Sequence, residues 1–387
     1  MSEENAFGKL VLAARTQRGW TQEEVAEKWG HTREYVSQVE RGIRKLEKWE
    51  EVERLAEILE ITSARLDAIG KSLPKHKSVA QSPSEADDVL FQALLEPSLA
   101  TVKLSWLIWY SENNNLIVSS LDDWIEKLNN ATTQYRGQFL RSAQQILAYA
   151  YEMKGKILFD RLHYDAAMGH FSTMLTLGEE VGDHDIMTLA MTYQGDILRK
   201  RGLYETAVRR LEAAKPSADQ ACLCVKGIRW VVLARGHAPY GQEERFKEAI
   251  NNALELVRET PEDLNALCNQ FNLVEVLQEQ AQGYSMLWKP EKALEIYKQT
   301  DLMRPVRSLR DLGSYSIIKA QAHAYSGNIE DGVTLALRGL DLANQYHSKR
   351  HVSRVQIMYD RLNVTSMSTH PRLRDLKEAL YKAQRTL

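Results

Sequence analysis

The stretch RTQRGWTQEEVAEKWGHTREYVSQVERGIRK, residues 15–45, decides the fold of the N-terminal part of the chain. Gly30 separates two short segments in which apolar residues recur at helical spacing. Thr21 opens the first segment and Glu24 follows three residues later, which is the capping-box pattern at the start of a helix. Thr32 is placed to cap the second segment. Two helices joined by a short glycine-containing turn form a helix-turn-helix motif.

The sequence on either side of this motif completes a small helical domain. Gly42 is placed to end the second helix of the motif in the left-handed conformation. A preceding helix is predicted over residues 7–17, and two further helices are predicted near 49–59 and 63–69. The expected unit is therefore a five-helix domain over residues 6–70, built around one small core.

The quoted stretch resembles the λ-repressor-like and Cro-like DNA-binding domains of the XRE type, over about residues 7–70. The resemblance implies that the third helix lies in the major groove of double-stranded DNA. Its exposed, base-facing positions are Arg33, Glu34, Ser37 and Gln38. Arg33 would pair with guanine and Gln38 with adenine. Contacts to the phosphates are implied for Gln22, Arg15, Arg41, Arg44 and Lys45.

Glu34 departs from what a DNA-facing surface favours. A carboxylate on this face repels phosphates unless it accepts a hydrogen bond from cytosine. The alternative is an internal ion pair between Glu34 and an arginine. The whole chain carries a formal net charge of −2, which excludes a globally basic nucleic-acid binder, so any attraction to DNA must come from a local basic patch.

Composition also sets the expected compartment. The opening residues MSEENAF lack the basic and apolar regions of a signal peptide, and no run of about 18 apolar residues occurs. Cysteines are few and odd in number, which indicates a reducing compartment. Cys222 and Cys224 form a C-x-C pair that favours small buried residues over a zinc site. We therefore expect a cytoplasmic protein without a membrane span, metal or cofactor.

Two segments follow the N-terminal domain. Residues 71–86, KSLPKHKSVAQSPSEA, are rich in serine and lack periodic apolar residues, as in a linker. From residue 87 to residue 387 the apolar pattern is helical almost throughout, and we interpret the apolar run Thr101–Tyr110 as a helix. The predicted fold class is therefore all-α.

An internal repeat appears within residues 87–387. GKILFDRLHYDAAMGHFSTM begins at Gly155, and GDILRKRGLYETAVRRLEAA begins 40 residues later at Gly195. The same offset relates Ala167 to Ala207. Small residues where two helices cross, with large residues filling the gap, are typical of tetratricopeptide (TPR) units. The pattern resembles TPR repeats over about residues 140–345, with five or six degenerate units, and predicts an α-solenoid with a concave binding surface.

An XRE-type domain followed by TPR-like repeats resembles the peptide-sensing bacterial regulators grouped as the RRNPP family. The resemblance implies a transcriptional regulator, a homodimer, whose repeats bind a signalling peptide that changes DNA binding. The alternative is a TPR scaffold with a protein as its input, localised by its helix-turn-helix. No Gly-rich phosphate loop, H-E-x-x-H or G-x-S-x-G motif occurs, so the sequence does not predict an enzyme.

Candidate ligand-binding residues come from two places in the repeats. In DLNALCNQFNLVEVL, residues 263–277, Asn265, Asn269 and Asn272 would form one polar stripe if the segment were helical. Asparagine amides both donate and accept, as peptide backbones require, although an ordinary solvated face gives the same pattern. Arg199 and Lys200 align with inner positions of a repeat and would hold an acidic group or a C-terminal carboxylate.

Overall fold

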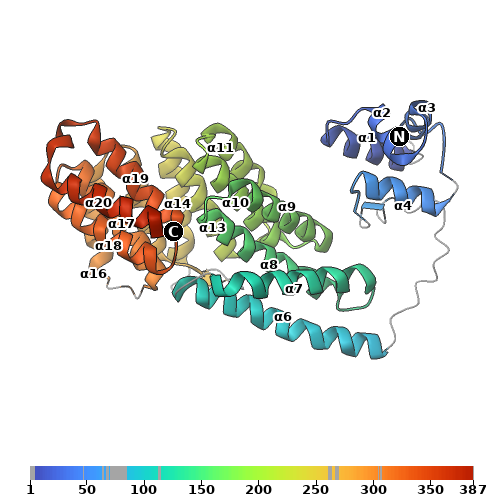
Figure 1. Cartoon of the computed structure of the whole chain (residues 1–387), viewed down its shortest axis with the longest axis horizontal. Coiled ribbons are helices and arrows are strands. Elements are labelled where there is room, and N and C mark those ends of the chain that lie inside the picture. The colour runs from blue at the N-terminus through green and yellow to red at the C-terminus, as the bar shows by residue number, and fades with distance from the viewer. Residues whose placement is uncertain are drawn as a thin grey trace. The chain divides into compact units, whose positions relative to one another are not determined.

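The computed structural model describes residues 5–46, 48–62, 65–66, 69, 85–111, 115–259, 264–265, 270–303, 305 and 307–386. The chain divides into two compact units, residues 1–81 and 82–387, which are described separately below. Both units are helical, as Figure 1 shows, so the predicted all-α class is confirmed. Among the described helices, none combines the length and the apolar character needed to cross a membrane.

The first unit contains α1 (Ala6–Gln17), α2 (Gln22–Trp29), α3 (Arg33–Glu40) and α4 (Trp49–Ile58). Their apolar faces share one core, in which Val11, Val25, Val36, Val52 and Leu55 are fully buried. A fifth helix was predicted over residues 63–69, and most of that segment lies outside the described residues. The predicted small core is therefore present, and each described helix buries one stripe of apolar residues in it.

Local signals fix the two helices of the motif. The Thr21 side chain accepts from the Glu24 backbone amide, and the Glu24 carboxylate accepts from the Thr21 backbone amide, which confirms the predicted capping box. These hydrogen bonds to Thr21 lower the pKa of Glu24. Gly30 ends α2 at φ 75°, and Thr32 caps α3. Only glycine adopts such a positive φ without steric cost, so the tight turn between the helices follows from the sequence.

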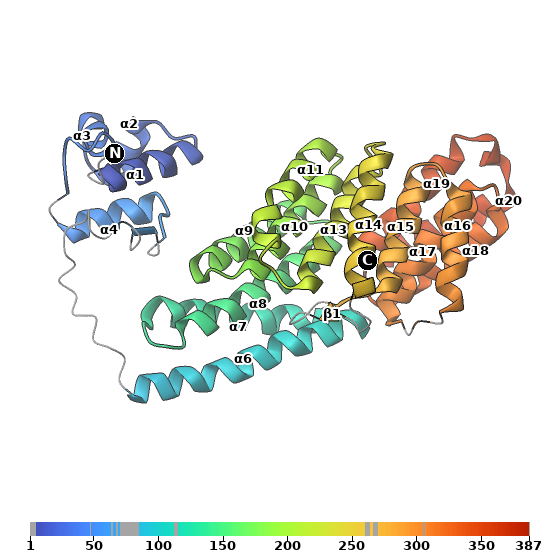
Figure 2. The same cartoon turned by 180° about the vertical axis from the view of Figure 1, so that it is seen from behind.

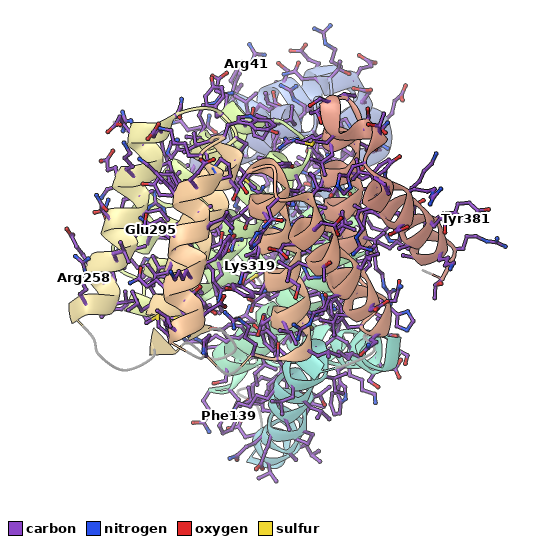
Figure 3. All side chains as sticks on the ribbon, turned by 90° about the vertical axis from the view of Figure 1, so that its left-hand side faces the viewer. Arg41, Phe139, Arg258, Glu295, Lys319 and Tyr381 are labelled. Carbon is purple, nitrogen blue, oxygen red and sulfur yellow. The ribbon has the colours of Figure 1, made fainter. Side chains whose placement is uncertain are left out.

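The described part of the second unit is a succession of helices, with β1 and β2 between α14 and α15 (Figure 2). They are α6 (Glu85–Ser111), α7 (Asn115–Gln134), α8 (Leu140–Asp160), α9 (Tyr164–Val181), α10 (His184–Lys200), α11 (Tyr204–Ala213), α12 (Lys215–Ala218), α13 (Leu223–His237), α14 (Glu243–Glu259), α15 (Leu273–Met286), α16 (Pro290–Leu302), α17 (Leu309–Tyr325), α18 (Ile329–Gln345), α19 (Lys349–Asn363), η3 (Ser366–Thr369) and α20 (Pro371–Thr386). Antiparallel pairs, beginning with α8 and α9, stack in chain order. In Figure 3, Tyr381 on α20 extends outward from the second unit.

The predicted small-to-large packing occurs inside the first two pairs. A Cβ atom at Gly155 on α8 would lie 2.5 Å from Phe171 on α9, and one at Gly195 on α10 would lie 2.6 Å from Leu211 on α11. Only a residue without a side chain leaves room for these fully buried partners. The 40-residue self-similarity in the sequence is therefore a self-similarity in how two helices pack.

The helix predicted over residues 263–277 is wrong in its first half. Leu264–Asn265 (β1) pairs antiparallel with Gln270–Phe271 (β2), and α15 begins only at Leu273. The Asn272 side chain accepts from the Glu275 backbone amide at 3.0 Å, so it is the N-cap of α15. Asparagine favours N-cap positions because its side chain satisfies a free amide there. Asn269 lies outside the described residues.

One carboxylate joins the beginning of the helical array to its end. Asp160, at the C-terminus of α8, is 1% exposed and accepts from Arg310 of α17 at 3.0 Å, from Arg350 of α19 at 3.0 Å and from Ser348 at 2.8 Å. Burial alone would raise the pKa of Asp160, but the two arginines and Ser348 hold it below its ordinary value. This network ties helices together that are 150 or more residues apart in the sequence.

Candidate functional site

A cavity of about 630 Å³ lies inside the second unit. Its walls come from α6, α8, α10, α13, α15, α17 and α19, which are mainly the first helices of the stacked pairs. A cavity of this size is within the range that holds a small molecule or a short peptide. Its lining is unusually rich in charge, with cations Lys156, Arg235, Arg307, Arg310, Arg350 and Arg354 and anions Asp196, Glu275, Glu279 and Asp311.

Several of these charges are already paired within the protein. Arg235 on α13 donates through two nitrogens to the Glu279 carboxylate on α15. Arg310 is 3% exposed, donates to Asp160, and stacks 3.7 Å from the Trp109 ring. Because these groups satisfy one another, they shape the cavity and leave little capacity for a ligand.

Arg354 on α19 is in a different situation. It is 8% exposed, and its polar partner among the described side chains is the Ser314 hydroxyl at 3.4 Å, with no described carboxylate within ion-pair distance. Burial and the nearby charges of Arg350, Arg199 and Arg235 lower the pKa of Arg354 to about 9. A buried cation without an ion-pair partner is costly, and the charge of Glu279 opposes this cost only in part.

Arg307 adds a second group of unused donors. Its Nε and Nη2 atoms are buried without a hydrogen-bond partner among the described residues, while its guanidinium carbon lies 3.8 Å from the centre of the Tyr315 ring. Stacking on the ring fixes the guanidinium plane without using its hydrogens. The stacked side chain therefore stands in the cavity wall with two buried donors that no described residue satisfies.

An acidic region occupies the α15 side of the cavity. Burial, with Asp311 on α17 and Glu279 on α15 close by, raises the pKa of Glu275 to about 8. The Glu275 side chain is nonetheless exposed to water inside the cavity. The cavity therefore presents unneutralised cations on α19 and the α16–α17 connection, and an excess of carboxyl groups around Glu275.

A second candidate surface is the outer side of α3 in the first unit. Arg33 and Glu34 are exposed and Ser37 and Gln38 are partly exposed, whereas Val36 and Val39 point into the core. Glu34 lies 3.7 Å from Arg41, which agrees with the internal ion pair considered from the sequence. Four polar side chains thus share one solvent-facing side of a short helix.

Glu40, at the end of α3, connects the first three helices. Its buried carboxylate accepts from Arg15 of α1 through two nitrogens and from the Gln22 amide of α2 at 2.7 Å. Arg15 also donates to the Trp20 carbonyl at 2.7 Å. Arg15 and Gln22 were predicted to contact phosphates, but these contacts hold both side chains within the domain. The sequence prediction missed this hub, which fixes the orientation of α3.

The remaining predicted phosphate contacts lie beyond α3. Arg41, Arg44 and Lys45 are exposed, and the Arg44 guanidinium lies 4.3 Å from the centre of the Tyr35 ring. Tyr35 in turn stacks on His31 with ring centroids 4.3 Å apart. The α3 face is therefore bordered by three cations, one of which is held over an aromatic ring.

Comparison with known proteins agrees with this geometry. A family model described as a helix-turn-helix domain matches residues 6–69. The chain carries an N-terminal helix-turn-helix domain. No curated protein matches the chain. The match covers the helix-turn-helix domain alone, and the region that follows it is helical apart from the short β1–β2 pair among its described residues.

The predicted ligand residues outside the helix-turn-helix domain lie around the cavity, but not as expected. Asn272 lines it as the cap of α15. Arg199 is buried and does not line the cavity; it forms an ion pair with Asp196 at 2.6 Å. Burial and the charges of Arg354 and Arg199 hold the pKa of Lys200 well below its ordinary value. The sequence prediction missed Arg354 on α19 and Arg307 in the α16–α17 connection, because a single arginine carries no motif.

We predict that Glu275 makes the stability of the second unit pH-dependent. Its pKa is about 8 in the folded chain against an ordinary value of 4.5, so the folded state holds a proton that the unfolded state has lost. Stability is therefore lost as pH rises from about 4.5 through about 8. Urea unfolding followed across this range should show a weaker pH dependence for Glu275→Gln than for the wild type. Parallel curves for the two proteins would contradict the prediction.

Proposed function

We propose that the protein is a sequence-specific DNA-binding transcriptional regulator in which α3 reads base edges. The observation that carries this proposal is the helix-turn-helix domain with Arg33, Ser37 and Gln38 on one free face of α3. Arginine and glutamine make two-pronged contacts with guanine and adenine in the major groove. Arg41, Arg44 and Lys45 would attract the phosphates beside them.

The second half of the proposal is that the helical array is a TPR-like sensor domain. The packing of Gly155 on Phe171 and of Gly195 on Leu211 supports this view. First helices that line a cavity, with second helices outside, are what a TPR-like superhelix would place there. We propose a signalling peptide as the ligand, because the cavity combines free arginine donors with the side-chain amides of Gln278 and Gln282.

Selection of DNA fragments from the source genome by the full-length protein tests the DNA half. We expect one palindromic site whose half-sites are about 34–36 Å apart, because two-fold related domains read DNA at that spacing. Absence of any enriched fragment, with and without peptide extracts of the source cells, would contradict the proposed function. It would favour a scaffold, with a protein as its partner.

Arg354→Met is expected to stabilise the protein in the absence of ligand. The substitution removes a buried cation that forms no ion pair with a described residue, and it keeps an unbranched side chain. Replacing such buried charge by apolar atoms is often neutral or stabilising by about 1–4 kcal/mol. Urea unfolding measures the change, and the same variant should lose affinity for an anionic ligand.

Arg338→Met, on α18 outside the set of cavity-lining residues, is the matched control and should leave stability within about 0.5 kcal/mol of the wild type. A clear loss of stability in Arg354→Met alone would mean that Arg354 is a structural cation. The anionic-ligand argument would then fail.

A further inference from the structure

An unbroken apolar stripe runs along the outer side of α6. Its members recur at alternating steps of three and four residues and are Leu90, Ala93, Pro97, Ala100, Leu104 and Leu107. All of them are exposed, with Leu90 at 71%, Leu104 at 55% and Leu107 at 68%. The opposite side of α6, including Phe91, is already buried in the core of the second unit. This helix therefore has two apolar sides, and the unit uses only one.

The neighbouring helix shows how an ordinary outer side looks in the same unit. Among the side chains of α7 that the structure describes, the exposed ones are polar or charged, namely Ser119, Ser120, Asp122, Asp123, Glu126, Lys127, Asn130, Thr133 and Gln134. A helix of a monomeric surface normally has this polar character. Apolar steps of three and four residues are instead the spacing of a helix that packs against another helix.

We propose that the α6 stripe is the contact between two copies of this chain, packed antiparallel about a two-fold axis that passes between Pro97 and Ala100. In that register Leu104 of one copy meets Ala93 of the other, and Leu90 meets Leu107. The two-fold axis repeats the Leu104–Ala93 contact, and a large residue facing a small one there lets the two helices approach closely. A two-fold contact uses the same surface twice, as the stripe does.

Charges beside the stripe favour the antiparallel direction. Glu96 and Lys103 lie on the same edge of the stripe, two helical turns apart, and both are exposed. Neither forms an ion pair with another described residue of its own chain. In the antiparallel register Glu96 of one copy faces Lys103 of the other, twice per dimer. If the two helices packed in parallel, Glu96 and Lys103 would each lie beside a residue that does not carry the opposite charge.

The dimensions suit a regulator that reads a two-fold site. α6 has 27 residues, so it is about 40 Å long at about 1.5 Å per residue. Antiparallel pairing would place the two N-terminal ends of α6, to which the linkers attach, about that far apart. This is close to the separation of half-sites of about 34–36 Å on DNA. The argument from half-site spacing rests on the proposed function. The contact between the two α6 stripes, called the seam below, does not.

A charge-reversal cycle tests the seam on the full-length protein without DNA, by sedimentation equilibrium. The wild type should dimerise at micromolar concentration, because a single helix seam is smaller than a standard interface of about 800 Å² per partner. Glu96→Lys and Lys103→Glu should each weaken dimerisation about tenfold, since each variant places like charges opposite one another twice. Combining both reversals should restore the wild-type dissociation constant, because the pairs re-form with opposite polarity.

Leu104→Glu is expected to weaken dimerisation at least about 100-fold, because it buries a charge in the seam. Glu126→Lys on the polar side of α7 is the matched control and should leave the dimer unchanged. Circular dichroism melts establish that the variants fold. A monomeric wild type, a dimer insensitive to Leu104→Glu, or a double reversal that fails to recover would each overturn the seam. Because no DNA is present, these outcomes are independent of whether α3 binds an operator.

Discussion

Replacing Arg33 and Gln38 together by alanine is expected to abolish the preference of the protein for one DNA sequence. Both side chains lie on the solvent side of α3, and neither contributes to the core. A two-pronged contact to a base contributes about 1–3 kcal/mol of discrimination. Loss of both should reduce the ratio of specific to non-specific affinity by roughly 30- to 25,000-fold. Fluorescence anisotropy with the selected operator and a scrambled duplex measures this ratio.

Arg54→Ala is the matched control for the loss of a positive charge. Arg54 is exposed on α4, away from the α3 face, within the same domain. It should leave the specificity ratio unchanged and lower all affinities slightly through the lost charge. Equal specificity in the double variant and the wild type, with both folded, would mean that α3 does not read the bases.

The second large effect is expected at Asp160. Asp160→Asn keeps the shape of the side chain but removes the charge that neutralises Arg310 and Arg350. Arg310 is 3% exposed and would become a buried cation without a counter-charge. Breaking a buried ion pair by removing one partner costs about 3–5 kcal/mol. We expect a loss of that size in the free energy of unfolding, measured by urea titration.

The same substitution five residues away is the control. Asp165 also pairs with an arginine, Arg201, but its side chain is 95% exposed. Exposed ion pairs contribute about 0–1 kcal/mol, so Asp165→Asn should unfold nearly as the wild type does. If both variants lost the same stability, the Asp160 network would contribute no more than a surface pair.

The sequence predicted best what short-range signals determine. Thr21 and Glu24 are three residues apart, and their capping box appears in the structure as expected. The helix prediction failed before Leu273, because asparagines spaced by four and then three residues fit both a helix face and a loop. Asn272 is itself a start signal for a helix, and placing the boundary there would have shortened the predicted helix correctly.

The candidate sites depend on pairs that no local pattern reveals. Glu40 meets Arg15 across 25 residues, and Asp160 meets Arg310 across 150. Asp160 lies inside the repeat comparison, at the position that Lys200 occupies in the next unit. That difference between two otherwise similar units was the available signal. A residue that differs from its equivalent in the next repeat indicates a role other than the packing that the two repeats share.

The Asp160 network also limits how this array can evolve. Open helical repeats contact only their neighbours, so units can be gained or lost by duplication and deletion with little effect elsewhere. Here a carboxylate on α8 must reach arginines on α17 and α19. Adding or removing one repeat between them would carry those arginines out of reach. We therefore expect relatives that retain this network to keep the same number of units and to differ instead in the lengths of their turns.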